Sequence, residues 1–223
     1  MSEERSAGAY PGWAEIPGGE FQLGASRNAP FLFDNEKWAH ALVIKPFEIS
    51  KAPVTNQEFQ AFTEDGGYGQ EAFWSTEGWK WVQKAGAKHP VYWRPDTLGK
   101  WLLRRFDQTL QLPPDPSLAN LDGRALAPVD VAAMAAGDSA FGCRQMLGNV
   151  WEWTADTFSA FPGFSADAYI EYSTMLFGDT KVLRGGAWTT RSRMIHGTYR
   201  NYFPADRQDV FAGFRTCRAN AGK

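Results

Sequence analysis

Short stretches of alternating apolar and polar residues in the first quarter of the chain predict strands. The segment AEIPGGEFQLGA (14–25) is typical of a pair of short strands around a glycine turn at 18–19. The segment ALVIKPFEISKAPVT (41–55) has the strongest strand pattern, and Pro46 and Pro53 interrupt it. We therefore expect a sheet built from short and frequently broken strands.

One helix is predicted together with both of its ends. Thr55 is a suitable N-cap, and Glu58 three residues later completes a capping box. Phe59 and Phe62 fall on one face of the helix, and the glycines at 66–67 end it. This segment is the clearest helical signal in the chain.

The remaining patterns are shorter or mixed. The tryptophan-rich segment 68–106 fits neither the helical nor the strand period, and 111–130 is typical of a loop because of its prolines. The segments KVLRGGAW (181–188) and FAGFRTCR (211–218) are predicted as strands that enter and leave the core. Long regular helices are not expected.

Composition changes this picture by adding large aromatic side chains to an irregular backbone. Aromatic residues make up 15% of the 223 residues, yet the mean hydropathy is only -0.41. The chain also has 22 glycines and 13 prolines, which favour turns. We expect a backbone of many turns that is held in place by buried aromatic rings.

Charge and cysteine content exclude several classes of protein. Lysine and arginine number 23 against 25 acidic residues, which gives no electrostatic case for binding nucleic acid or an anionic membrane. The polar N-terminus lacks the apolar core of a signal peptide, so we expect a cytoplasmic protein. Cys143 and Cys217 are too few for a disulfide framework, and we expect two buried free thiols.

Five motifs occur in order over nearly the whole chain. They are GGEFQLGA (18–25), APVTNQEFQAF (52–62), GNVWEWT (148–154), LRGGAW (183–188) and AGFR (212–215). Together they resemble the formylglycine-generating-enzyme-like superfamily, the sulfatase-modifying factors. The resemblance implies an α+β, C-type-lectin-like fold with little regular secondary structure. It also implies a single domain over 13–220 that follows a flexible N-terminus at 1–12.

The formylglycine-generating branch itself is excluded. Its members carry two active-site cysteines shortly after the RGG-W motif. Here the corresponding segment, RGGAWTTRSRMIHGTYRN (184–201), contains no cysteine. Cys217 lies beyond this window, so thiolate chemistry of that kind has no residue to use.

Further motifs resemble the C-terminal domain of nonheme-iron sulfoxide synthases of the ergothioneine and selenoneine type. They are FLFDNEKWAH (31–40), EDGGY (64–68), VYWR (91–94), FPGF (161–164), YIEYSTMLFG (169–178) and TYRNYFP (198–204). Enzymes of that family use O2 to join a cysteine-type thiol to histidine betaine. The resemblance implies that this chain is the substrate-binding and catalytic domain of such an oxidoreductase.

Two departures from the family affect this prediction. The family's iron ligands are three histidines of an N-terminal, DinB-like helical domain, whereas this sequence has only His40, His89 and His196, without paired spacing. We therefore expect Fe(II) to be bound by a separate DinB-like domain rather than by this chain, which alone would be inactive. A piece of the usual core is also shortened near 112–120.

The motif around Glu152 resembles a calcium site of relatives. The matching positions are Gln145, Gly148, Val150 and Glu152, which offer two side-chain oxygens and two backbone carbonyls as hard ligands for a structural Ca²⁺. The alternative is that Glu152 accepts hydrogen bonds in a turn while Trp151 and Trp153 fill the core. Arg215 is expected to form a buried structural ion pair, and Trp188 is expected in the core.

The resemblance also assigns candidate catalytic and substrate-binding residues. Tyr169 and Tyr172 have the spacing of a tyrosine pair in the sulfoxide synthases, where a phenol is thought to donate a proton or an electron. The matching substrate-binding residues are Arg200, Asn201, Tyr202 and Phe203. Some relatives carry an acid at the position of Phe203 for a larger thiol, so its absence favours free cysteine.

The residues leave structural alternatives open for both groups. The two tyrosines can simply pack their rings in a loop, and TYRNYF can be an ordinary core strand. At the level of function, the alternative is a non-catalytic, lectin-like module that binds a ligand or a protein. In that case the chain would bind its ligand without turnover.

Overall fold

The computed structural model describes residues 10–95, 101–103 and 118–219 and groups the chain into two compact units, Met1–Val54 with Pro113–Lys223, and Thr55–Leu112. The predicted single domain over 13–220 spans both. Most of the predicted flexible terminus and of the shortened segment lies outside the described residues.

Regular elements are short in both units, as the aromatic-rich, turn-rich composition predicts. The strands are β1 (Trp13–Ile16), β2 (Gly19–Leu23), β3 (His40–Ile44), β4 (Phe47–Ser50), β5 (Trp93–Pro95), β6 (Trp101–Leu103), β7 (Trp151–Thr157), β8 (Lys181–Arg184), β9 (Asn201–Phe203), β10 (Ala212–Gly213) and β11 (Cys217–Ala219). The α-helices are α1 (Asn56–Glu64) and α2 (Thr76–Ala85). The 3-10 turns are η1 (Asp34–Glu36), η2 (Gly67–Gly69), η3 (Glu71–Phe73), η4 (Ala135–Gly137), η5 (Ile170–Tyr172), η6 (Thr174–Leu176) and η7 (Ser192–Met194).

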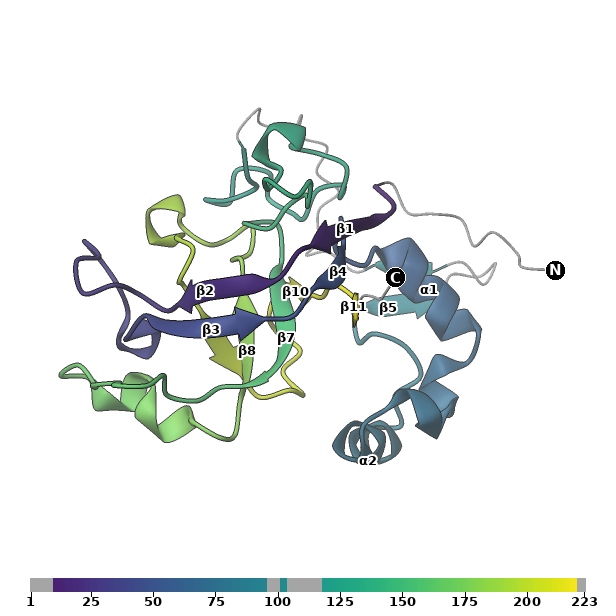
Figure 1. The fold of residues 1–223 in the computed structure, drawn as a ribbon. Coiled ribbons are helices and arrows are strands. Elements are labelled where there is room, and N and C mark those ends of the chain that lie inside the picture. Colours follow the sequence, from purple (N-terminus) through teal and green to yellow (C-terminus); the bar gives the residue numbers. More distant parts are fainter. Residues whose placement is uncertain (1–9, 96–100, 104–117, 220–223) are drawn as a thin grey trace. The chain divides into compact units, whose positions relative to one another are not determined.

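The prediction that 14–25 forms a self-paired hairpin is wrong. β1 pairs antiparallel with β4, and β2 pairs antiparallel with β3, which Figure 1 shows as a ribbon. The register runs on across the break, because Ile16 faces Phe47 and Gly19 faces Ile44. The glycines at 18–19 therefore kink one long strand opposite Pro46 instead of reversing the chain.

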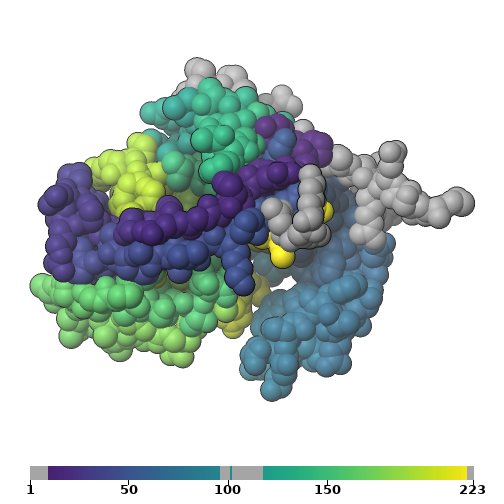
Figure 2. Space-filling view, in the orientation of Figure 1, coloured from purple at the N-terminus to yellow at the C-terminus, as the bar shows by residue number. Residues whose placement is uncertain are grey.

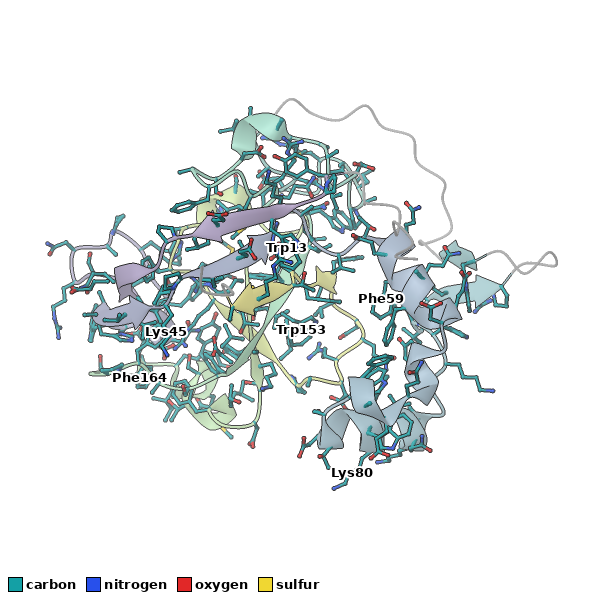
Figure 3. The ribbon with its side chains drawn as sticks, turned by 45° about the vertical axis from the view of Figure 1, so that its right-hand side comes forward. Trp13, Lys45, Phe59, Lys80, Trp153 and Phe164 are labelled. Carbon is teal, nitrogen blue, oxygen red and sulfur yellow. The ribbon has the colours of Figure 1, made fainter. Side chains whose placement is uncertain are left out.

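The first unit is built on a mixed four-stranded sheet of order β10-β7-β8-β9. On β8, Val182 and Leu183 point to opposite faces, and each belongs to a different buried cluster. Leu183 packs with Trp151, Ala187 and Tyr199, whereas Val182 packs with Phe158 and Tyr202. Trp153, labelled in Figure 3, belongs to β7 and packs against the first of these clusters.

The long connection between β7 and β8 is tied to η1. Ser173 donates to the carboxylate of Asp34, and Lys37 forms an ion pair with Asp167. Figure 2 shows the blue residues near 30–45 lying directly against the green residues near 160–180. Two segments far apart in the sequence are thus brought together beside the sheet.

The second unit contains both α-helices and a cluster of aromatic rings. The predicted capping box of α1 is confirmed, since Thr55 Oγ1 accepts from Glu58 N at 3.1 Å and Thr55 N donates to Glu58 Oε2 at 2.8 Å. Phe59, labelled in Figure 3, packs on Phe62 with ring centroids 5.4 Å apart.

No helix among the described residues is long and apolar enough to cross a membrane.

Helix α2 lies in the tryptophan-rich segment for which the sequence predicts no element. Its N-cap is Ser75, whose side chain accepts from Gly78 N, and Gly86 ends it at φ 58°. Both signals are visible in the sequence, but the clustered tryptophans obscure the helical period between them.

Both cysteines are free thiols. Cys143 is buried, as predicted, but the prediction of a buried Cys217 is wrong because this residue is exposed on β11. Strand β11 lies at the edge of the three-stranded sheet β1-β4-β11, where one side of it pairs with no strand among the described residues.

Candidate functional site

Three consecutive polar residues, Asp34, Asn35 and Glu36, are buried in η1. The Glu36 side chain has no exposed area and accepts from Phe33 N at 3.0 Å and from His196 Nε2 at 2.7 Å. Thr198 Oγ1 also donates to this carboxylate. A buried acid with three donors is a fixed polar centre rather than a solvated surface group.

The sequence alone predicts no role for this acidic turn. Its motif FLFDNEKWAH (31–40) indicates only the family resemblance. The signal that was available is the run of three polar residues directly after two phenylalanines, Phe31 and Phe33. Burial of such a run requires partners from elsewhere in the chain, and the sequence alone does not name them.

The two predicted catalytic tyrosines lie next to this acidic turn. Tyr169 is 66% exposed, and its ring centroid is 6.4 Å from that of Tyr172. Tyr172 stacks on Phe33 at 5.4 Å and meets Tyr202 edge-on at 5.9 Å. Phe33 in turn stacks on Tyr199 at 5.2 Å. The structure therefore brings together Tyr169, Tyr172 and Tyr202 from two separate predicted motifs.

Three phenols of this site, Tyr172, Tyr199 and Tyr202, are held in their neutral form. Burial raises the pKa of Tyr172, and the nearby Tyr202, Tyr199, Asp34 and Glu36 raise it further. Burial likewise raises the pKa of Tyr199 and Tyr202. At neutral pH these hydroxyl groups carry a proton that can be donated.

The four residues of the RNYF motif divide between two faces of the chain at β9. Tyr202 stacks on Phe158 at 4.0 Å and Arg200 lies over the same ring at 4.9 Å, so both belong to the tyrosine side. Asn201 and Phe203 alternate with them and face the other way. Phe203 packs against the cluster around Trp151, so only half of the predicted substrate residues join the tyrosines.

Arg200 is a buried cation with a clear structural task. It is 3% exposed, its Nε donates to Asn35 O at 2.7 Å, and its Nη2 donates to Ser159 O at 2.9 Å. Burial lowers the pKa of Arg200 to about 10, and the neighbouring Arg184 contributes to this shift. The guanidinium connects the acidic turn to the segment after β7.

The predicted calcium residues are occupied by other contacts. Both oxygens of Glu152 accept from Arg215 Nε, at 3.0 and 2.9 Å, and Gln145 Oε1 accepts from Asn149. A guanidinium at the carboxylate opposes a second cation there, which counts against the calcium prediction. Gly148 and Val150 lie directly before β7, and nothing in the structure tests a calcium ion at these four residues.

Glu152 lies in strand β7 and not in a turn. Trp151 and Trp153 point to the opposite face from Glu152, where both pack against the buried cluster that contains Leu183. Arg215 forms the buried ion pair that the sequence predicts, and Trp188 is buried as predicted. A carboxylate between two tryptophans is thus a consequence of strand alternation.

The part of the chain that the structure describes offers no set of side chains that could bind iron. No group of three or more histidine, cysteine, aspartate or glutamate side chains there is arranged to hold a metal ion. His196 contacts Glu36, while His40 Nδ1 lies 3.0 Å from Trp38 O. These residues do not fit an iron site.

Comparison with known proteins identifies the family. The sulfatase-modifying factor enzyme 1-like domain matches residues 1–97 and 109–220, and the chain belongs to this family. Hercynine oxygenase of Mycolicibacterium smegmatis is 34% identical over 90% of this chain and 59% of that protein. The enzyme of the same name from Mycobacterium tuberculosis is 33% identical over 87% of this chain and 58% of its own length. The chain thus spans about three-fifths of the curated relatives that it matches.

Solved structures confirm the α+β, formylglycine-generating-enzyme type of fold. PvdO from Pseudomonas aeruginosa matches with a TM-score of 0.58 and 18% identity, covering 93% of this chain and 94% of PvdO. Treponema denticola variable protein 1 matches with a TM-score of 0.56 and 16% identity, over 92% of this chain and 94% of that one. At these identities the likeness concerns the fold alone.

Proposed function

We propose that this chain is the substrate-binding and tyrosine-bearing part of an ergothioneine-type sulfoxide synthase. The reaction is the O2-dependent formation of a C–S bond between cysteine and histidine betaine. The observation that carries the proposal is the exposed Tyr169 beside Tyr172, set against the buried acidic turn. The hercynine oxygenases, similar over most of the chain, support the same substrate class.

In this proposal the chain's own residues bind substrate and supply a proton. Tyr169 is accessible and therefore is the phenol that meets the reacting atoms. Tyr172 holds the Tyr169 ring in place by ring contact, and it is itself fixed between Phe33 and Tyr202. A cationic trimethylammonium group is suited to the faces of such rings.

The iron of the proposed reaction comes from a partner. A DinB-like helical domain that carries the histidine ligands, either as a separate chain or as a further part of the same protein, would supply the metal. Iron supplies O2 activation when bound. Ile170 and Met175, exposed apolar residues of the same segment as Tyr169, give such a domain a surface to cover.

Co-purification with a DinB-like domain tests the proposal. The complex, loaded anaerobically with Fe(II), should form the C–S product from cysteine and histidine betaine when O2 is admitted. Tyr169→Phe should lower the rate roughly 100-fold because a positioned acid is lost. Tyr92→Phe, at a similarly exposed tyrosine of the second unit, is the matched control and should leave the rate unchanged.

The opposite result supports the binding-module alternative. If the iron-loaded complex binds histidine betaine but forms no product, and binding is the same without iron, the chain is a ligand-binding module. That outcome would contradict the proposed function.

A further inference from the structure

The segment that carries Tyr169 lies on the surface of the first unit. All residues from 165 to 171 are exposed, and Tyr169 itself is 66% exposed. The 3-10 turn η5 follows Tyr169 and is closed by a bond from Tyr172 N to Tyr169 O at 3.1 Å. An exposed segment buries little apolar surface, so specific polar bonds have to fix its position.

One buried carboxylate bonds to this segment on both sides of Tyr169. Asp34, which is 2% exposed, accepts from Asp167 N at 3.4 Å through Oδ2 and from Ser173 Oγ through Oδ1. Asp167 precedes Tyr169, and Ser173 follows it and has no exposed area. The Asp34 side chain therefore joins the two ends of the short stretch that carries the tyrosine.

Lys37, which directly follows η1, adds a second contact to the same segment. Its Nζ forms an ion pair with Asp167 and donates to Ser165 O at 3.4 Å. The lysine is buried whereas Asp167 is exposed, so the turn supplies the fixed end of this contact. The turn is itself held, because Asn35 O accepts from Arg200 Nε at 2.7 Å.

We propose that Asp34 is a positioning residue that holds Tyr169 in the orientation in which its phenol donates a proton. The inference rests on the proposed function for the role of Tyr169 and adds the group that fixes this residue. A proton donor acts efficiently only when it is held within hydrogen-bond reach of its acceptor. Asp34 is too deeply buried to meet the substrate, and it acts through Asp167 N and Ser173.

The substitution Asp34→Asn is expected to release one side of the tyrosine segment. Asp167 N and Ser173 Oγ bond to different oxygens of Asp34, and an asparagine has only one oxygen. It can therefore accept one of the two bonds but not both. Ser173→Ala is the second variant, because it removes the bond on the far side of Tyr169 and leaves the residues of η1 unchanged.

Fluorine NMR of the full chain labelled with 3-fluorotyrosine tests whether Tyr169 is held. The Tyr169 signal is the one that is missing in Tyr169→Phe. In Asp34→Asn and in Ser173→Ala, we expect this signal to move towards the shift of free 3-fluorotyrosine. Its transverse relaxation rate should fall by roughly a third, the difference between a rigid and a flexible site.

Asp138→Asn is the matched control for these spectra. It makes the same change of side chain at another ion-paired aspartate of the first unit, whose Oδ1 accepts from Arg144 Nε at 2.8 Å. This variant should leave the Tyr169 signal unchanged. A general loosening of the chain by loss of an ion pair would affect both variants alike.

A double-mutant cycle in the iron-loaded complex with the DinB-like domain separates positioning from folding. Asp34→Asn should lower kcat and kcat/KM equally, by roughly 10-fold, because a misplaced acid is lost mainly in the transition state. In the Tyr169→Phe background, the same substitution should have no further effect, because the group that it positions is gone. A merely structural role would lower the rate in both backgrounds.

The inference is overturned if the Tyr169 fluorine signal is the same in wild type, Asp34→Asn and Ser173→Ala. It is also overturned if Asp34→Asn lowers kcat equally with and without the Tyr169 hydroxyl. If the wild-type complex forms no product, the proposed function fails, and the fluorine signal still decides whether Asp34 holds Tyr169 in place. The two failures are therefore distinguishable.

Discussion

At the scale of single residues, the contacts of Glu152 explain why a carboxylate lies between two tryptophans in the sequence. Strand alternation sends both indoles to one face and the carboxylate to the other, where Arg215 meets it. Arg215 also donates to Ser50 O, Lys51 O and Arg144 O. One buried guanidinium therefore joins three segments of the first unit.

Removing this guanidinium should be costly. Arg215→Ala leaves the Glu152 carboxylate buried without its partner, and we expect a loss of about 3–5 kcal/mol in the free energy of unfolding. Urea denaturation measures this loss. Arg207→Ala is the control, because Arg207 pairs with Asp209 at the surface with both side chains exposed. Equal effects of the two substitutions would contradict a structural role for Arg215.

The phenol of Tyr172 gives a second prediction at this scale. The pKa of Tyr172 is above its unfolded value of about 10, so its contribution to stability is complete below pH 10 and is lost as pH rises through the folded pKa. In a spectrophotometric titration, Tyr172→Phe should remove amplitude only from the most alkaline phase. A loss from the early phase would show that Tyr172 is solvated.

At the scale of elements, strands were predicted better than their pairing. The segments 14–25 and 41–55 do contain four strands, but Gly18 has φ 74° and lies so close to Ile44 O that a Cβ there would be 2.5 Å away. A close approach of this kind depends on the partner strand, and a local pattern does not show it. The sequence likewise did not show which strands pair with β7 and β8.

Helix α1 gives a prediction for how much its N-cap contributes to stability. Thr55→Ala removes the side-chain oxygen that accepts from Glu58 N, and we expect a loss of about 1 kcal/mol in the free energy of unfolding. Circular dichroism during urea denaturation measures it. Lys80→Ala, on the exposed side of α2 in Figure 3, is the control and should change little. If both variants match wild type, the cap does not stabilise this helix.

At the scale of the whole molecule, the fold type followed from five ordered motifs, whereas the candidate site followed only in part. The spacing of Tyr169 and Tyr172 was visible in the sequence. The acidic turn at 34–36 was not, because its function depends on donors more than a hundred residues away, such as His196 and Ser173. The family resemblance identified the motif at 31–40, whereas its hydrogen-bond partners are visible only in the structure.

The Asp138 carboxylate makes the stability of the chain depend on pH in the acid range. The bond from Arg144 lowers the pKa of Asp138 below its usual value, so its contribution to stability is present above pH 4 or so and is lost as pH falls through the folded pKa. Asp138→Asn should therefore lose less stability than wild type between pH 7 and pH 3 in thermal melts. Parallel curves for the two proteins would contradict this ion pair.

Our proposal that this chain takes part in oxidative C–S bond formation together with an iron-binding domain is tested most directly by mass spectrometry. The product is formed under ¹⁸O₂ by the iron-loaded complex. We expect a sulfoxide that joins cysteine to histidine betaine and carries the heavy oxygen on sulfur. A complex that binds iron and histidine betaine but releases only unchanged substrates would contradict it.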